Sequence, residues 1–211
     1  MKKFIVLLLL LITTVIGTAQ QLYFEAGKTI SSFDYKNSQG QSLDNLQASN
    51  HSFMTLGYRN QLFVKKLNSS IGIAYAGYGA IGSDDTVGNF MEWDVNYLEF
   101  NLGLDYELFK IKEAAVYIKG TSSAAFLMQG TQTLNNKVIN LKNVDDFNKT
   151  VFDFRIGLGF LQPISENLSF YAQYMYGKSL DMASGDAELK IASNQVGFGL
   201  LINISKKNRQ Q

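Results

Sequence analysis

The chain has 211 residues with no cysteine, one proline and one tryptophan, and 19 basic residues nearly balance 18 acidic ones, for a net charge of +1. The lack of cysteine excludes disulfides and a lipoprotein-type anchor, and the balanced charge gives no sign of nucleic-acid binding. Because glycine, phenylalanine and tyrosine are abundant while proline is nearly absent, the composition favours a strand-rich protein.

The first 19 residues have the pattern of a secretory signal peptide. Met1-Lys2-Lys3 is a basic region, residues 4–16 form an apolar run interrupted only by two threonines, and Gly17-Thr18-Ala19 supplies small residues for cleavage. The apolar run is shorter than the roughly 20 residues that a membrane-spanning helix needs. We therefore expect a cleaved signal peptide over 1–19 and a single exported domain over 20–211.

From residue 20 onward, apolar and polar side chains alternate in segments separated by polar gaps. The clearest segment is 97–108, where every second residue from Leu98 to Leu108 is apolar and the residues between them include three carboxylates. Successive side chains of a strand point to opposite faces, whereas helical spacing would scatter these apolar residues around the axis. In chain order the segments are 22–30, 54–62, 71–76, 97–108, 116–128, 152–160, 170–177 and 195–204.

The gaps between these eight segments alternate between long and short. The long gaps are 36–50, 83–89, 129–148 and 182–186, and the short ones lie near Lys65, Lys110 and Pro163. Outer-membrane barrels have an even strand number, short periplasmic turns and longer external loops, and closure satisfies every backbone polar group inside lipid. We therefore expect an all-β fold, an eight-stranded antiparallel up-and-down transmembrane β-barrel with both termini in the periplasm.

Three short motifs are similar to motifs found in known outer-membrane barrels. The last segment has the polar, glycine and apolar spacing by which barrels are recognised for assembly, and glycine alternates with aromatic and aliphatic residues in two others. The motifs are Gln195, Gly197, Leu200 and Ile202; Phe154-Arg155-Ile156-Gly157-Leu158-Gly159; and Tyr171-Ala172-Gln173-Tyr174. With them the mature chain resembles the small outer-membrane β-barrel family of Bacteroidota, also called PorT-like. The resemblance implies an integral outer-membrane protein of a Gram-negative cell envelope, without an agreed activity.

The inward parity of the strands carries charged side chains. An eight-stranded barrel is just wide enough to be filled by its own side chains, and buried charge is costly unless it is paired. We therefore expect a polar network that plugs the lumen, rather than a porin-like conduction path. Its members are Glu25, Arg59, Glu99, Asp105, Lys119, Asp153 and Arg155.

Acidic residues cluster around the second long gap, in an acidic loop formed by Asp84, Asp85, Glu92 and Asp94. Carboxylates at this site could bind Ca²⁺ or bridge to lipopolysaccharide through cations, but the spacing is not that of a dedicated calcium loop, so a solvated loop is the favoured interpretation. With a single histidine and no cysteine, we expect no metal site and no cofactor.

Some small barrels modify lipids, which requires a nucleophile, a base and an orienting acid within hydrogen-bond reach. His51 is the only histidine, and Ser52 and Glu92 are its conceivable partners. Adjacent residues of a strand point to opposite faces, which argues against a pairing of His51 with Ser52. We therefore expect a protein that is not an enzyme.

The expected function is structural or surface-interacting, in the cell outer membrane. The barrel would act through loops 36–50, 83–92, 129–148 and 181–188. A transport or secretion-accessory role of the PorT-like kind is the alternative, and a lipid-modifying enzyme is the third class. Expected partners are outer-membrane lipid and lipopolysaccharide, the barrel assembly machinery during insertion, and an extracellular ligand or secretion-system subunits. We expect a monomer that does not bind nucleic acid.

Overall fold

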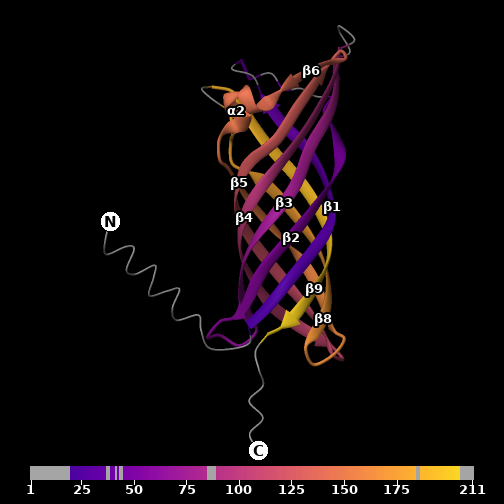
Figure 1. Ribbon diagram of the computed structural model, residues 1–211, viewed down its shortest axis with the longest axis vertical. Coiled ribbons are helices and arrows are strands. Elements are labelled where there is room, and N and C mark those ends of the chain that lie inside the picture. Colours follow the sequence, from indigo (N-terminus) through magenta and orange to yellow (C-terminus); the bar gives the residue numbers. More distant parts are fainter. Residues whose placement is uncertain are drawn as a thin grey trace, which may run out of the picture.

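The computed structural model describes residues 20–36, 39–40, 42, 45–84, 89–183 and 186–204, and it shows a closed antiparallel barrel of tilted strands (Figure 1). The expected eight-stranded up-and-down barrel is confirmed. Its strands are β1 (Gln20–Lys36), β2 (Gln47–Gln61), β3 (Leu67–Asp84), β4 (Asn89–Ile111), β5 (Ala114–Leu134), β7 (Val151–Pro163), β8 (Leu168–Ser179) and β9 (Glu188–Asn203). Each pairs with its neighbours along the chain, and β9 pairs with β1 to close the ring. The expected signal peptide, 1–19, lies outside the described residues.

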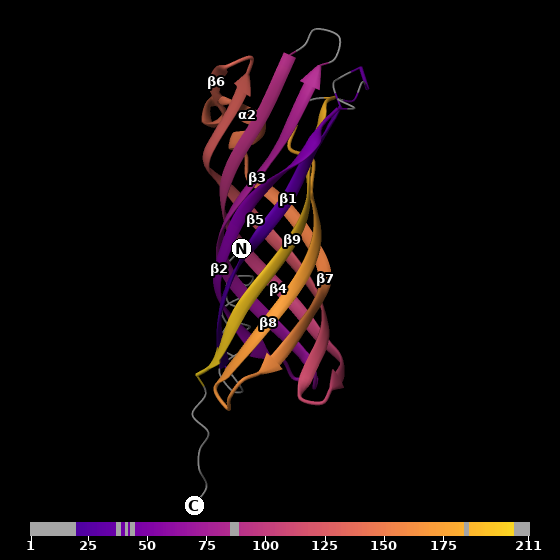
Figure 2. The same ribbon diagram turned by 90° about the vertical axis from the view of Figure 1, so that its right-hand side faces the viewer.

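The two ends of the barrel differ in the length of their connections. Three tight turns, over 62–66, 112–113 and 164–167, lie at one end (Figure 2). The first and last strands also meet there, because the backbone N–H of Ile204 donates to the carbonyl oxygen of Gln20 at 2.8 Å. By the rule that short turns are periplasmic, this is the periplasmic end, and the longer connections lie at the external end.

The outer wall is apolar, while charged side chains are buried inside. Leu102, Ile71 and Ile156 expose 60%, 59% and 58% of their surface, whereas Glu99 and Asp105 expose 1% and 3%. A soluble sandwich would bury the first set and hydrate the second, because a large contiguous apolar surface is unfavourable in water. The inversion fits a wall in contact with lipid and a lumen filled by protein.

The strands run further toward the external end than the alternation predicted. β3 continues to Asp84 and β4 begins at Asn89, so the interpretation of 83–94 as an acidic loop is wrong for Glu92 and Asp94, which lie within β4. Asp85 and the side chain of Asp84 lie outside the described residues. Alternation fades in this region because the outward side chains leave the lipid and become polar, which removes the apolar half of the pattern.

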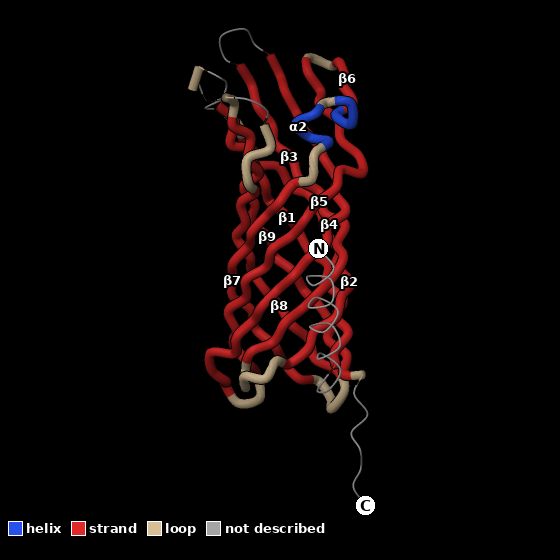
Figure 3. Tube along the Cα trace, turned by 90° about the vertical axis from the view of Figure 1, so that its left-hand side faces the viewer, coloured by secondary structure: helices blue, strands red, loops and turns tan. Residues whose placement is uncertain are grey.

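The predicted loop 129–148 also contains regular structure. β5 continues to Leu134 and turns through Asn135 and Asn136, both with positive φ (48° and 65°), into the short strand β6 (Lys137–Asn140). Two consecutive left-handed residues are the requirement of a tight type I′ hairpin, and asparagine tolerates that conformation. The 3₁₀ helix η1 (Leu141–Asn143) and the helix α2 (Asp145–Asn148) follow, beside the external rim (Figure 3). No helix among the described residues is long and apolar enough to cross a membrane.

This segment closes the external end of the lumen. Leu141 and Phe147 are buried among inward residues of the barrel, with the ring of Phe147 5.9 Å from that of Phe33 and the ring of Phe33 6.1 Å from Trp93. We call this apolar cluster the external plug. Its buried members are Phe33, Phe53, Ala76, Tyr78, Ala80, Trp93, Val95, Tyr97, Ala125, Leu141, Phe147, Val151, Met182, Leu189 and Ile191.

Candidate functional site

Below the external plug, the middle of the lumen is organised around the guanidinium of Arg155. One terminal nitrogen donates to both carboxylate oxygens of Glu99 at 2.8 Å, and it also lies 2.8 Å from the hydroxyl of Tyr78. The Arg155 Nε atom forms an ion pair with Asp153 at 2.5 Å, and Tyr78 donates to Glu99 at 2.5 Å. A single cation therefore neutralises two carboxylates that are almost fully buried.

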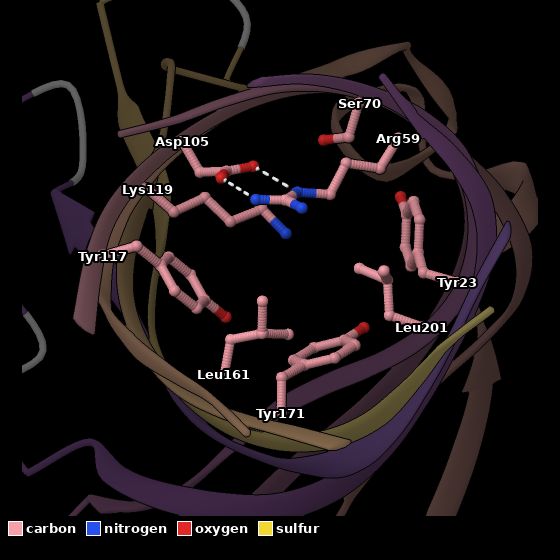
Figure 4. Close-up of a pocket in the computed structure, with 9 residues that line it drawn as sticks. All are labelled: Tyr23, Arg59, Ser70, Asp105, Tyr117, Lys119, Leu161, Tyr171 and Leu201. Atoms are coloured by element: carbon pink, nitrogen blue, oxygen red, sulfur yellow. Dashed lines mark hydrogen bonds and ion pairs between the residues drawn. The ribbon is translucent and has the colours of Figure 1, made fainter. Parts of the chain in front are cut away.

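A second ion pair lies toward the periplasmic end, where Arg59 of β2 reaches past β3 to Asp105 of β4, on one side of the lumen (Figure 4). The Arg59 Nε atom donates to one carboxylate oxygen at 2.9 Å and a terminal nitrogen donates to the other. Asn68 donates to the same carboxylate at 3.0 Å, and Arg59 also donates to Gln21 at 2.7 Å. The fork geometry satisfies both carboxylate oxygens at once.

Glu25 and Lys119 are linked through an amide rather than to each other. Gln173 donates to both oxygens of Glu25 at 2.8 and 3.0 Å, and its own oxygen lies 3.5 Å from the Lys119 ammonium. Tyr171 also donates to Glu25 at 3.2 Å, while Lys119 stands 5.6 Å from the centre of the Tyr23 ring. Within the described residues, neither Glu25 nor Lys119 forms a salt bridge.

The structure therefore brings the seven inward charged residues into three groups. Two groups contain ion pairs, and the third is a hydrogen-bonded set around Gln173. The side chains leave little space. The cavity lined by Tyr23, Arg59 and Lys119, which Figure 4 shows, measures about 20 Å³, and one beside Arg155 measures about 30 Å³. Each volume is enough for one or two water molecules, since a single water needs about 10–15 Å³ by this measure.

On the outer wall, the structure places His51 away from Ser52. The Ser52 hydroxyl is exposed and lies 2.9 Å from the Lys28 ammonium. His51 instead contacts Ser49 through Nε2 at 2.8 Å, and its Nδ1 atom lies 3.8 Å from Asp94. Sequence reasoning missed Ser49, although serine and histidine two positions apart in a strand share a face.

Two examples illustrate the similarity of this fold to solved structures. Neisserial surface protein A is similar over 87% of this chain and 97% of its own, with a TM-score of 0.50 and 10% identity. The outer membrane protein OprG of Pseudomonas aeruginosa is similar over 88% of this chain and 97% of its own, with a TM-score of 0.52 and 12% identity. No protein-family model and no curated protein matches the sequence.

At these identities the likeness establishes the fold alone. Two observations fit a location in the outer membrane: the fold is an eight-stranded up-and-down barrel, and its outer wall is apolar. This is the location that the sequence predicted. The chain is an integral β-barrel protein of the outer membrane.

Proposed function

We propose that this barrel has a closed lumen and acts at the cell surface through its external end, as a structural or surface-interaction protein. The observation that carries the proposal is the filling of the lumen. The external plug covers one end, and below it the Arg155 and Arg59 groups fill the middle and the periplasmic half. Cavities of about 20 and 30 Å³ are too small to form a water-filled path.

The external end offers a surface with which a partner can interact. A groove of about 460 Å³ lies on the outside of β1, β8 and β9, near the rim. Asp34 pairs with Lys178 at 2.6 Å and Lys190 pairs with Glu188 at 3.0 Å, while Lys36 lies 3.8 Å from Glu188. We call this the rim groove. Its alternating charges suit an amphiphile with phosphate groups, such as lipopolysaccharide. The ammonium groups can bind phosphate directly, and the carboxylates can bind it through a bridging divalent cation.

Conductance in planar lipid bilayers tests the closed lumen. We expect the wild-type chain to insert without stable ion steps. A matched variant in which a short glycine-serine link replaces 135–150 removes Leu141 and Phe147 but keeps both arginine groups, and we expect it to stay closed. Large, stable steps from the wild-type protein would contradict the proposal.

Binding to purified lipopolysaccharide tests the rim groove. The double variant Lys178→Glu with Lys190→Glu reverses two charges in the groove, and we expect weaker binding with a smaller salt dependence. Lys142→Glu makes a similar charge change on η1, away from the groove, and is the matched control. Equal loss of binding in both variants would point to general surface charge and would contradict a specific groove.

A transport or secretion-accessory role is the alternative, supported by the resemblance to PorT-like barrels of Bacteroidota. Such a protein would co-purify from the native outer membrane with subunits of a secretion machine. Recovery of the barrel alone, as a monomer, supports the surface-interaction proposal instead. Recovery with secretion subunits, unchanged by the rim-groove variants, would favour the alternative.

A further inference from the structure

One stretch of the barrel wall departs from the regular ladder. The pairing of β2 with β3 runs to Ala48 and resumes at Phe53, with a register shift between them. β1 and β3 approach each other at this level, because the Ser31 hydroxyl lies 2.9 Å from the backbone nitrogen and 3.1 Å from the carbonyl oxygen of Gly79. Residues 49–52 therefore separate from β3, as expected of a β-bulge, while they stay paired with residues 28–31 of β1. We call these four residues the arch.

The arch places two of its side chains over the outer face of β3. Gly77 and Gly79 face outward there, because the residues between and beside them, Ala76, Tyr78 and Ala80, belong to the external plug. A Cβ atom on Gly79 would lie 2.6 Å from His51 Nε2 and 2.8 Å from Ser49 Oγ. The absence of side chains at these glycines is what leaves room for the histidine and the serine.

β4 supplies a carboxylate beside the histidine. The hydroxyl oxygen of Ser49 lies 2.8 Å from His51 Nε2, and His51 Nδ1 lies 3.8 Å from the Asp94 carboxylate. Asn96 donates to the same Asp94 oxygen at 3.3 Å. The two ring nitrogens therefore face a hydroxyl on one side and a carboxylate on the other, which is the order of contacts in a serine-hydrolase triad. Such contacts are commonly long before substrate binds.

The position of this group along the barrel indicates the substrate. Met54, Tyr75 and Leu98 form a cross-strand row on β2, β3 and β4, and the outer wall below it is apolar. Asp94 and Gly79 pair four residues above that row. At about 3.3 Å per residue along strands tilted by about 40°, the group lies roughly 10 Å above that row, at the outer side of the headgroup region, which extends about 5–8 Å beyond the hydrocarbon. The acyl esters of amphiphiles lie just below this level, at the boundary between hydrocarbon and headgroups, so a substrate reaches the group by rising partly out of the leaflet.

We propose that Ser49, His51 and Asp94 form a hydrolase site on the outer wall that cleaves acyl esters of amphiphiles in the outer leaflet. The expectation that the chain is not an enzyme rested on Ser52 as the partner of His51, whereas the partner in the structure is Ser49. The proposal is independent of the closed lumen, because none of the three side chains enters it.

The reaction is a two-step acyl transfer to water. Ser49 Oγ attacks the ester carbonyl, forming a C–O bond while its proton passes to His51 Nε2. The bond to the alcohol then breaks, and His51 returns the proton to that leaving oxygen. Water attacks the acyl-Ser49 ester with His51 as base, which releases a carboxylic acid and restores the hydroxyl. Asp94 is a positioning residue that holds the imidazole and stabilises its charged form.

Fatty-acid release from the full barrel in mixed micelles tests the proposal. One arm uses a diacyl phospholipid and the other uses lipopolysaccharide, so the arm that responds identifies the source of the ester. We expect release from at least one, and a fall of about a hundredfold or more in Ser49→Ala and His51→Gln. Ser52→Ala, the matched serine control, keeps wild-type release. A fluorophosphonate probe labels Ser49 in the wild type.

Further readouts separate catalysis from folding. Heat-modifiable migration on SDS gels establishes that each variant is a folded barrel. Asp94→Asn removes a negative charge beside His51 but leaves Glu92 of β4 and Lys28 of β1, so the maximal rate falls and the rising limb of the pH–rate profile moves to lower pH. A purely structural aspartate would not move that limb. Absence of release from both lipids overturns the proposal, as does release that Ser49→Ala retains.

Discussion

Removal of the Arg155 side chain should destabilise the barrel more than any other single truncation of a charged residue in the lumen. Arg155 contacts Glu99, Asp153 and Tyr78, and its side chain is only 7% exposed. Arg155→Ala leaves two buried carboxylates without a cation, and breaking a buried pair costs about 3–5 kcal/mol. Arg59→Ala should cost less, because Arg59 serves one carboxylate and is 15% exposed.

Neutral replacement of all three charged residues in this group separates the cost of unpaired charge from the cost of lost side-chain contacts. In Arg155→Met with Glu99→Gln and Asp153→Asn, no unpaired charge stays in the Arg155 group, so the loss should be well below the sum of the single substitutions. The assay is urea unfolding in lipid vesicles, followed by the fluorescence of Trp93, the single tryptophan, which lies in the external plug. A loss below about 1 kcal/mol for Arg155→Ala, or additive losses in the triple variant, would refute the central role of this guanidinium.

Of three further predictions, two use the same unfolding assay and the third uses hydrogen exchange of individual amides. Gly159→Ala should destabilise the barrel, because a Cβ there would lie 2.1 Å from the Tyr117 ring, whereas Gly120→Ala meets open space and should be nearly neutral; equal effects would contradict this packing. Leu102→Arg on the lipid-facing wall should cost about 2–4 kcal/mol, while Ile164→Arg in a periplasmic turn should cost little, and a reversed order would argue against the assigned belt. In the β8–β9 connection, slight desolvation acts to raise the pKa of the exposed Asp181, but the backbone N–H groups of Leu189 and Ala183 hold it below its usual value. The ionised carboxylate therefore stabilises the connection above the ordinary carboxyl range, and this protection is lost as the pH falls through the lowered pKa. Hydrogen exchange of the two amides, corrected for intrinsic rates, should lose protection on acidification in the wild type, while Asp181→Asn should show no such dependence.

Sequence alternation was sufficient for the barrel but not for its external end. In the membrane most outward side chains are apolar, so segments such as 97–108 show a clean period of two. Above the membrane that requirement ends, and the strands continue through Glu92 and Asp94 with polar residues on the outer face. The extension of β5 into β6 was indicated only by Asn135-Asn136, a hairpin signal that is easily read as part of a polar loop.

The candidate sites show the same contrast. Parity along each strand identified the inward charges, because direction along a strand is a local property. Asp153 lies two residues from Arg155 on the same strand, but the contact of Arg155 with Glu99 depends on how distant strands are placed, and so does the contact of His51 with Asp94. The external plug was missed because Leu141 and Phe147 enter the lumen from a connection whose short helices have no extended apolar pattern.

The closure of the ring has a consequence for biogenesis. β1 is the first strand of the domain and β9 the last, and they pair from Gln21 with Asn203 to Lys36 with Glu188. Until the C-terminal strand has been translocated, both strands bordering the gap present unpaired amide and carbonyl groups, which can template aggregation. The unfolded chain therefore crosses the aqueous periplasm before β1 and β9 have paired. We expect periplasmic holdase chaperones to protect it from aggregation during this step.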